Sequence, residues 1–162
     1  MKKGTKIALL LIVLSVLFLV RPRDIFPTGL SLQYAILIED LSYYHDVPTH
    51  IALAVAQVES GTKMIVSETN TNGSHDIGIF QLNSNFIDYF EERLWQNQWD
   101  FDPNAVFDNI EMGIMILKDL AMRTGNWDDA IKAYHVGLTG LHIYPDSADA
   151  YFNKVIQVVS EL

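Results

Sequence analysis

The residue best placed for chemistry is Glu59, near the end of a stretch with helical periodicity. It follows Val55 by four residues and Ile51 by eight, so it lies at the edge of the apolar stripe that they form. Partial desolvation there, together with the negative end of the helix, raises the pKa of a carboxyl group. A general acid that works near neutral pH needs such a shift. The alternative is an ordinary solvated glutamate at a helix end.

Three further segments carry side chains able to contact a ligand. Gln81 and Asn83 lie in or beside an apolar stretch, where their amides could face a sugar or the stretch could be plain core. Tyr134 and His135 lie at the end of a helical pattern, where core packing and a structural histidine are the alternatives. Tyr151 lies early in the last helical pattern, and most such tyrosines are packing residues. Each of these signals is weak alone.

The elements that position these residues are expected to be helices. From Leu30 onward the apolar spacing is helical, and no segment alternates convincingly with period two. Residues 62–76 are rich in Thr, Asn and Ser and are expected to form a loop. We therefore expect one compact all-α domain over residues 30–162. Its helices are predicted at residues 31–45, 48–60, 86–94, 108–123, 127–136 and 146–159.

Several helix ends carry recognisable signals. Gly61 and Gly137 each follow a periodic run, as is typical of the residue just past a helix. Asp108 with Glu111 resembles a capping box at the start of a long helix. Ser147 is a candidate cap for the last helix.

Residues 1–23 have the pattern of an export segment. Lys2, Lys3 and Lys6 precede an apolar run over residues 7–20, and arginines follow at once. A helix over that run spans roughly 21 Å, short of a hydrocarbon core of about 30 Å, although flanking basic residues can snorkel. No small-x-small cleavage site follows, so we favour an uncleaved membrane anchor, with a cleaved signal peptide as the alternative. Either places the domain outside the cytoplasm, in the periplasm or cell envelope.

The composition excludes several kinds of site. The chain has no cysteine, which rules out a thiol nucleophile and a zinc–thiolate centre. Its net charge of −9 disfavours nucleic acid as a partner. Residues 68–79 faintly echo a calcium loop, but Ile79 stands where that loop needs a glutamate. The histidines show no metal-ligand spacing on one helix face, so we expect no metal and no cofactor.

Taken together, the order and spacing of these segments resemble the soluble lytic transglycosylase domain, which has a lysozyme-like fold. The resemblance covers about residues 34–158. The loop over residues 70–76 is also similar to small specialised members that accompany secretion, conjugation and pilus machines, so an envelope-spanning machine of that kind is an expected partner. The matching positions are Glu59-Ser60, Gly78-Ile79-Phe80-Gln81, Ala133-Tyr134-His135-Val136-Gly137 and Tyr151.

The resemblance implies cleavage of the β-1,4 bond between N-acetylmuramic acid and N-acetylglucosamine in peptidoglycan, with a 1,6-anhydro product. It implies that Glu59 is the single catalytic acid and then base, and that the Tyr151 hydroxyl holds its carboxyl group. His135 and Phe80 depart from the usual Asn and Met of the family, which puts the binding role of His135 in question. The resemblance implies a substrate-binding role for Ser60, Phe80, Gln81, Tyr134, His135 and Tyr151.

Two alternatives stay open at the level of sequence. Asp76 lies two residues before Gly78 and could position a water molecule, which would make the protein a hydrolysing muramidase. The other alternative is a non-catalytic peptidoglycan-binding or assembly factor, which would have the cleft without a working acid.

Overall fold

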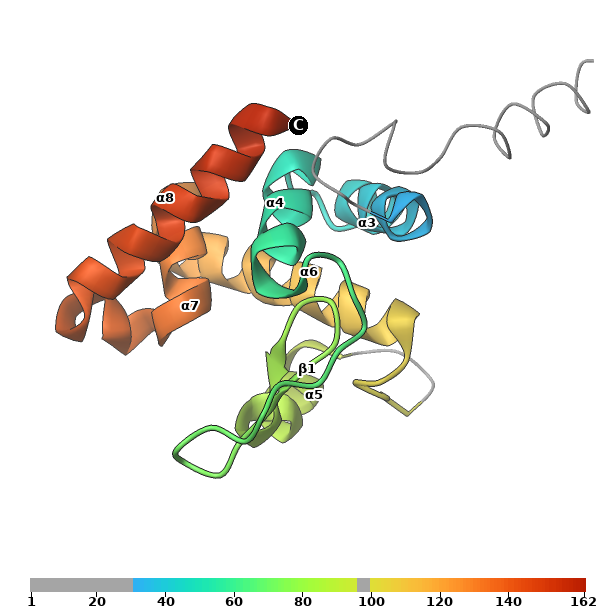
Figure 1. Cartoon of the computed structure of the whole chain (residues 1–162), viewed down its shortest axis with the longest axis horizontal. Coiled ribbons are helices and arrows are strands. Elements are labelled where there is room, and N and C mark those ends of the chain that lie inside the picture. The colour runs from blue at the N-terminus through green and yellow to red at the C-terminus, as the bar shows by residue number, and fades with distance from the viewer. Residues whose placement is uncertain (1–30, 96–99) are drawn as a thin grey trace, which may run out of the picture.

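The computed structural model describes residues 31–95 and 100–162, and within them the fold is predominantly helical (Figure 1). The export or anchor segment expected over residues 1–23 lies outside the described residues. Among the described residues, no helix has the length and apolar character needed to cross a bilayer. The elements are α3 (Leu32–Tyr44), α4 (Thr49–Ser60), β1 (Asp76–Ile77), β2 (Leu82–Asn83), the 3-10 turn η1 (Ser84–Phe86), α5 (Ile87–Leu94), α6 (Val106–Thr124), α7 (Trp127–Ile143) and α8 (Pro145–Glu161).

The six predicted helices are confirmed, most of them to within two residues at each end. Gly61 and Gly125 end α4 and α6 in the left-handed conformation, with φ of 61° and 81°. Gly137 also has a non-helical backbone, with φ of 73° and ψ of 165°. It ends the first helical segment as expected, but the chain resumes a helix directly after this kink, and the sequence analysis did not predict that extension.

Two predicted helix caps are wrong. The helix α6 begins at Val106, and the Asp108 carboxylate instead accepts a hydrogen bond from the backbone N–H of Asp102 at 2.9 Å. Glu111 contacts the His45 ring at 3.0 Å rather than the start of its own helix. Ser147 lies inside α8, which begins at Pro145. In each case, a partner distant in sequence or an earlier helix start overrides the local pattern.

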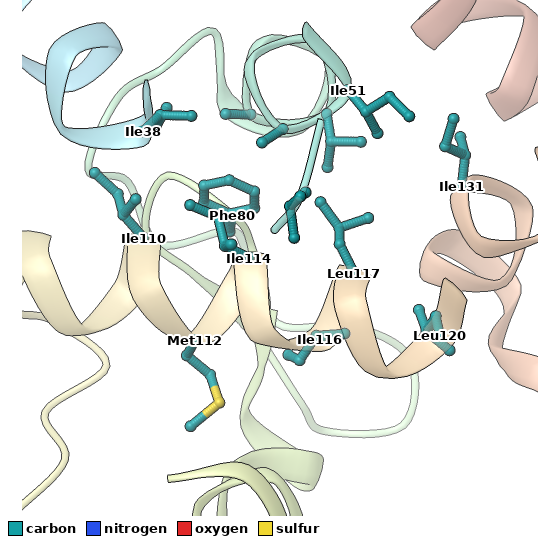
Figure 2. Close-up of a cluster of buried hydrophobic side chains, with 14 of the residues drawn as sticks. Ile38, Ile51, Phe80, Ile110, Met112, Ile114, Ile116, Leu117, Leu120 and Ile131 are labelled. Atoms are coloured by element: carbon teal, nitrogen blue, oxygen red, sulfur yellow. The ribbon is translucent and has the colours of Figure 1, made fainter. Parts of the chain in front are cut away.

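The helix α6 runs through the middle of the core (Figures 1 and 2). Ile110, Ile114 and Leu117 are fully buried and point from α6 toward α3 and α4. Phe80 lies between these helices, also fully buried. Gly113 makes this packing possible, because a Cβ atom there would lie 2.2 Å from the Phe80 ring. The core therefore fixes the segment around Phe80 against α6.

A small hairpin, absent from the prediction, lies between α4 and α5. The strands β1 and β2 are antiparallel, with Asp76 opposite Asn83, and Val66 adds an isolated bridge to Ile77. Strands of two residues are too short to show a period of two in the sequence. The hairpin carries Asp76 and Gln81 toward the end of α4.

Asn109 of α6 ties this hairpin to the core. Its side chain is fully buried, accepts from the backbone N–H of Phe80 at 3.0 Å, and donates to the carbonyls of Ile77 and Pro103 at 2.9 Å each. A Cβ atom at Gly78 would lie 2.2 Å from the Asn109 amide, and Gly78 has φ of 80°. This one buried amide therefore fixes the position of the hairpin relative to α6.

Candidate active site

Glu59 lies in the last turn of α4, where the left-handed Gly61 ends the helix. Its carboxylate accepts a hydrogen bond from the Tyr151 hydroxyl of α8, with an O···O distance of 2.5 Å. Tyr151 is only 5% exposed, and burial beside Glu59 raises the pKa of the phenol well above its ordinary range. The phenol therefore keeps its proton and remains a donor to the carboxylate.

Burial is the largest cause that raises the pKa of Glu59, from an ordinary value of 4.5 to about 7. The hydrogen bond from Tyr151 acts in the opposite direction, because it favours the charged form. The charge of Asp76 adds to the increase. A carboxyl group with such a pKa holds a proton in an appreciable fraction of molecules near neutral pH and can accept one back.

A cleft of about 500 Å³ opens beside Glu59. Four of the residues predicted from the sequence line it, namely Glu59, Gln81, Tyr134 and His135. Asp76 lines it as well. The remaining walls come from α5, from α6 and from the segment around Gly137 in α7, so the cleft lies where the hairpin and the four helices α4 to α7 meet.

Ser60, Phe80 and Tyr151 do not line the cleft, although the sequence analysis expected all three to bind substrate. Ser60 is buried and donates to the Ile79 carbonyl at 2.8 Å, which joins α4 to the hairpin segment. Phe80 is fully buried in the core, so its ring has no route to a ligand. Tyr151 is buried behind the Glu59 carboxylate. These three residues support the site from behind the cleft. The prediction that the Phe80 side chain contacts substrate is wrong, because its ring is fully buried.

Tyr134 connects the frame to the cleft. Its hydroxyl donates to the backbone carbonyl of Phe80 at 2.8 Å, while its side chain faces the cavity. Burial is the main cause that raises the pKa of Tyr134 well above its ordinary range, and the charges of Glu59 and Asp76 add to this increase. Tyr134 thus lies within electrostatic reach of both carboxylates.

Gln81 adopts a backbone conformation that only a minority of residues tolerate, with φ of 48°. Its side-chain amide donates to the Gly78 carbonyl at 2.8 Å and more weakly to the Ile65 carbonyl at 3.3 Å. Both contacts use the amide nitrogen, so with respect to the residues that the structure describes the amide oxygen stays available to a ligand in the cleft. This is the arrangement expected of a side chain fixed to present one acceptor.

His135 lines the cleft, and its ring is held in place by stacking on Tyr151. Its ring lies parallel to the Tyr151 ring, with centroids 4.7 Å apart and an interplanar angle of 1°. Its Nε2 atom lies 3.1 Å from the Ser147 hydroxyl. Partial burial is the main cause that lowers the pKa of His135, and Lys154 adds to this decrease. His135 therefore covers the phenol that holds Glu59.

Asp76 is held by amides of its own loop and hairpin. Its carboxylate accepts from Asn83 at 2.7 Å and from Asn70 at 3.2 Å, and its backbone N–H donates to the Ser67 hydroxyl at 2.8 Å. Asn83 also donates to Ser74 at 3.0 Å. A second carboxylate is thus fixed in the same cleft as Glu59.

Several residues at the site escaped the sequence analysis as functional candidates. Asn70 entered the sequence analysis only as part of the polar loop, and not as a hydrogen-bond partner of Asp76. Phe86 and Tyr89, on the α5 side of the cleft, are 55% and 46% exposed. Arg123 lines the cleft from α6 and forms an i,i+4 ion pair with Asp119, a spacing that the sequence does display. Within the described residues, no group of three or more His, Asp or Glu side chains could hold a metal ion.

Comparison with known proteins gives two kinds of match. The family described as "Transglycosylase SLT domain" matches residues 37–150, most of the chain. The protein named IpgF from Shigella sonnei is 26% identical over 97 residues, which cover 57% of this chain and 60% of that protein. IpgF from Shigella flexneri matches with the same identity and coverage, so the chain spans about 60% of the length of these curated relatives. No solved structure matches significantly.

Proposed function

Because the chain belongs to the SLT transglycosylase family, we propose that it is a peptidoglycan lytic transglycosylase with Glu59 as its acid and base. The proposal includes the lysozyme-like architecture of that family for the helical domain. It also includes a location outside the cytoplasm, in the periplasm or cell envelope, where peptidoglycan is found. The single observation that carries it is the Glu59 carboxyl group, with a pKa raised to about 7, beside a cleft and held by a buried phenol.

The first half of the reaction uses the acid form of Glu59. Its proton passes to the glycosidic oxygen as the bond from that oxygen to C1 of N-acetylmuramic acid breaks. The bond electrons leave with the oxygen, which becomes the 4-hydroxyl group of N-acetylglucosamine. C1 is left with oxocarbenium character beside a newly formed Glu59 carboxylate. The Tyr151 hydroxyl supports this charged state of the carboxylate through its hydrogen bond.

The second half returns the proton. The C6 hydroxyl of the same muramic acid attacks C1 and closes the 1,6-anhydro ring, while its proton passes to Glu59. No water is consumed, and Glu59 ends in the acid form in which it started. Because the nucleophile belongs to the substrate, a single carboxyl group suffices, and proximity supplies what a second carboxylate does in ordinary glycosidases.

The test is digestion of purified sacculi by the full chain and by Glu59→Gln. Proton transfer of this kind contributes roughly 10²–10⁴-fold, so we expect Glu59→Gln to keep its fold and lose at least that factor in rate. Glu39→Gln is the matched control, because it makes the same chemical change at an exposed position of α3. Equal rates for the wild type and Glu59→Gln would refute the acid–base role. No clearing by the wild type at any pH would favour a non-catalytic peptidoglycan-binding factor.

Asp76 supports a second candidate, a hydrolysing muramidase. It lines the same cleft as Glu59, and most enzymes that hydrolyse glycosidic bonds use a pair of carboxyl groups in one cleft. Mass spectrometry of the released muropeptides separates the reactions, because a hydrolysed end carries one water more than an anhydro end. A hydrolysed product that disappears in Asp76→Asn would establish the muramidase.

Two further parts of the proposal rest on the sequence pattern alone. The segment over residues 1–23 anchors the domain to a membrane or is removed as a signal peptide. The polar loop over residues 70–76 has the character of small members that serve secretion, conjugation or pilus machines. Cell fractionation of the tagged full chain tests the first part, because an anchored protein should be recovered with the membranes. Affinity purification of the same tagged chain tests the second part, because components of the envelope machine should co-purify with it.

A further inference from the structure

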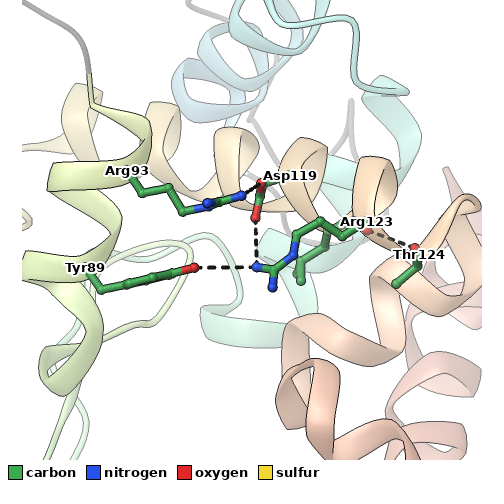
Figure 3. Close-up of polar contacts among 6 residues, drawn as sticks. Tyr89, Arg93, Asp119, Arg123 and Thr124 are labelled. Carbon is green, nitrogen blue, oxygen red and sulfur yellow. Dashed lines mark hydrogen bonds and ion pairs between the residues drawn. The ribbon is translucent and has the colours of Figure 1, made fainter.

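Two arginines contact a single aspartate beside the cleft (Figure 3). Arg93 of α5 and Arg123 of α6 both contact Asp119 of α6, and Tyr89 of α5 closes the group. Asp119, Arg123 and Tyr89 line the cleft. Two positive charges meet one negative charge here, so the cluster keeps a net positive charge at the cleft wall.

The two arginines share Asp119 unequally. Arg93 donates to Asp119 at 2.8 Å, which is the distance of a strong charge-assisted hydrogen bond. Arg123 reaches Asp119 only at 3.4 Å and the Tyr89 hydroxyl only at 3.5 Å, and both distances are at the limit of a hydrogen bond. Arg93 is therefore the closer partner of Asp119, and the positive charge of Arg123 is less fully compensated.

Arg123 has donors to spare. Both of its contacts use Nη1, and among the residues that the structure describes its Nε and Nη2 groups have no hydrogen-bond partner. The Arg123 side chain is 42% exposed. Of the described residues that line the cleft, it is the only Lys or Arg. A planar guanidinium group with free N–H donors is suited to bind a carboxylate through two parallel bonds.

We propose that Arg123 forms a carboxylate subsite on this wall of the cleft, and that it reads the acidic substituent of peptidoglycan. This inference rests on the proposed function, because it assigns a part of that substrate to a part of that cleft. The sugars of the glycan strand are uncharged apart from the lactyl group of each muramic acid. That group either carries a peptide stem with free carboxylates or, in a stripped strand, ends in a carboxylate itself.

The surroundings of Arg123 fit a sugar with an acidic branch. Phe86 and Tyr89 expose aromatic surface on the α5 side of the cleft, and aromatic faces suit the apolar faces of sugar rings. Arg123 and the Tyr89 hydroxyl lie within contact of each other. A sugar packed against α5 would thus place its substituent beside the guanidinium group of Arg123.

Binding to insoluble sacculi tests the subsite without relying on catalysis. We compare the full chain carrying Glu59→Gln with the double variant that adds Arg123→Gln, in co-sedimentation at several salt concentrations. We expect the added change to weaken binding about fivefold to tenfold and to reduce its salt dependence. Arg123→Lys should lie between the two, since it keeps the charge without the planar fork.

Two further variants test the role of charge: one should strengthen binding, and the other is a control that should leave it unchanged. Asp119→Asn keeps the shape of the cluster but frees both arginines, so it should tighten binding about twofold to threefold. Lys63→Gln removes a positive charge from an exposed position and should leave binding unchanged. A general loss of positive charge would affect Lys63→Gln and Arg123→Gln alike.

Three substrates identify the source of the carboxylate. Intact sacculi carry stem peptides, the glycan strands that an amidase strips from sacculi carry free lactyl carboxylates, and chitin oligosaccharides carry neither; binding to the two soluble substrates is measured by titration in solution instead of co-sedimentation. An Arg123→Gln effect confined to intact sacculi assigns the stem, and one confined to the stripped strands assigns the lactyl group. An equal effect on chitin oligosaccharides, no effect on either sacculi or stripped strands, or no binding by the Glu59→Gln chain would overturn the subsite. An inactive wild type that still shows the Arg123 effect would refute only the proposed catalysis.

Discussion

The contact between Tyr151 and Glu59 yields the sharpest prediction. Tyr151→Phe removes one hydroxyl group from a side chain that is 5% exposed and leaves its ring in place. The lost bond lowered the pKa of Glu59, because it favoured the carboxylate form. The pKa of Glu59 must therefore rise further in the variant, and the acid form must persist to higher pH.

The magnitude follows from the kind of bond that is lost. A hydrogen bond to a charged group contributes about 1.5–3 kcal/mol, and one pKa unit corresponds to about 1.36 kcal/mol. Removing the hydroxyl should therefore raise the pKa of Glu59 by roughly one to two units. Starting from about 7, the new pKa lies at about 8 to 9.

The assay is the pH dependence of kcat/KM on solubilised glycan strands. In the wild type, the rate should fall as pH rises through about 7, where Glu59 loses its proton. In Tyr151→Phe this alkaline limb should move to higher pH by roughly one to two pH units. The maximal rate should also be lower, because the carboxyl group is less well oriented. Tyr134→Phe is the control for the limb, since its hydroxyl contacts the Phe80 carbonyl instead of Glu59.

An alkaline limb that stays in place in Tyr151→Phe, or moves to lower pH, would refute this reasoning. It would mean that the group titrating in the profile is not the carboxyl held by Tyr151. A shift of equal size in Tyr134→Phe would attribute the change to general disturbance of the cleft.

The remaining predictions concern stability and use denaturant unfolding. Because the folded pKa of Glu59, about 7, exceeds its ordinary value of 4.5, ionisation destabilises the fold by an amount that is absent below pH 4.5, grows up to pH 7 and then stays constant. Glu59→Gln should therefore be more stable than the wild type by up to about 3 kcal/mol above pH 7, and by little below pH 4.5. A difference in unfolding free energy that does not change with pH would contradict the raised pKa of Glu59. Asn109→Ala should cost about 2–4 kcal/mol, since it leaves two buried backbone groups and one partly buried one without their partner, and a loss below 1 kcal/mol would show that the hairpin is held elsewhere. Gly78→Ala should cost a similar amount, because its Cβ would lie 2.2 Å from the same amide at a positive φ, whereas Gly73→Ala meets no atom within 4 Å and controls for strain at positive φ alone.

Local pattern was sufficient to predict how Glu59 is presented. The spacing from Ile51 and Val55 placed it at the edge of an apolar helix face, and Gly61 marked the end of that helix, as the structure has it. These inferences work because a helix relates residues three to eight positions apart by simple geometry. The contact with Tyr151 joins residues 92 positions apart, and no local rule reaches that far. Only the resemblance to a known family suggested it.

The same limit explains what went wrong. Asp108 and Glu111 had the spacing of a capping box, but their carboxylates bind Asp102 and His45 instead. Arg123 and Asp119 displayed an i,i+4 pair, yet the spacing could not show that the pair lies on a cleft wall. Polar side chains find their partners only after the helices have packed, so their roles are the least visible part of the sequence.

The separation of Glu59 and Tyr151 along the chain has a consequence for when catalytic competence is acquired. A ribosome adds Glu59 to the chain 92 residues before Tyr151, so the nascent protein carries the carboxyl group without its hydrogen-bond donor until α8 has docked. Any event that detaches α8 later, such as a proteolytic nick or a competing partner, would silence the protein without touching the cleft walls. The docking of α8 is thus the step that completes the site of the proposed enzyme.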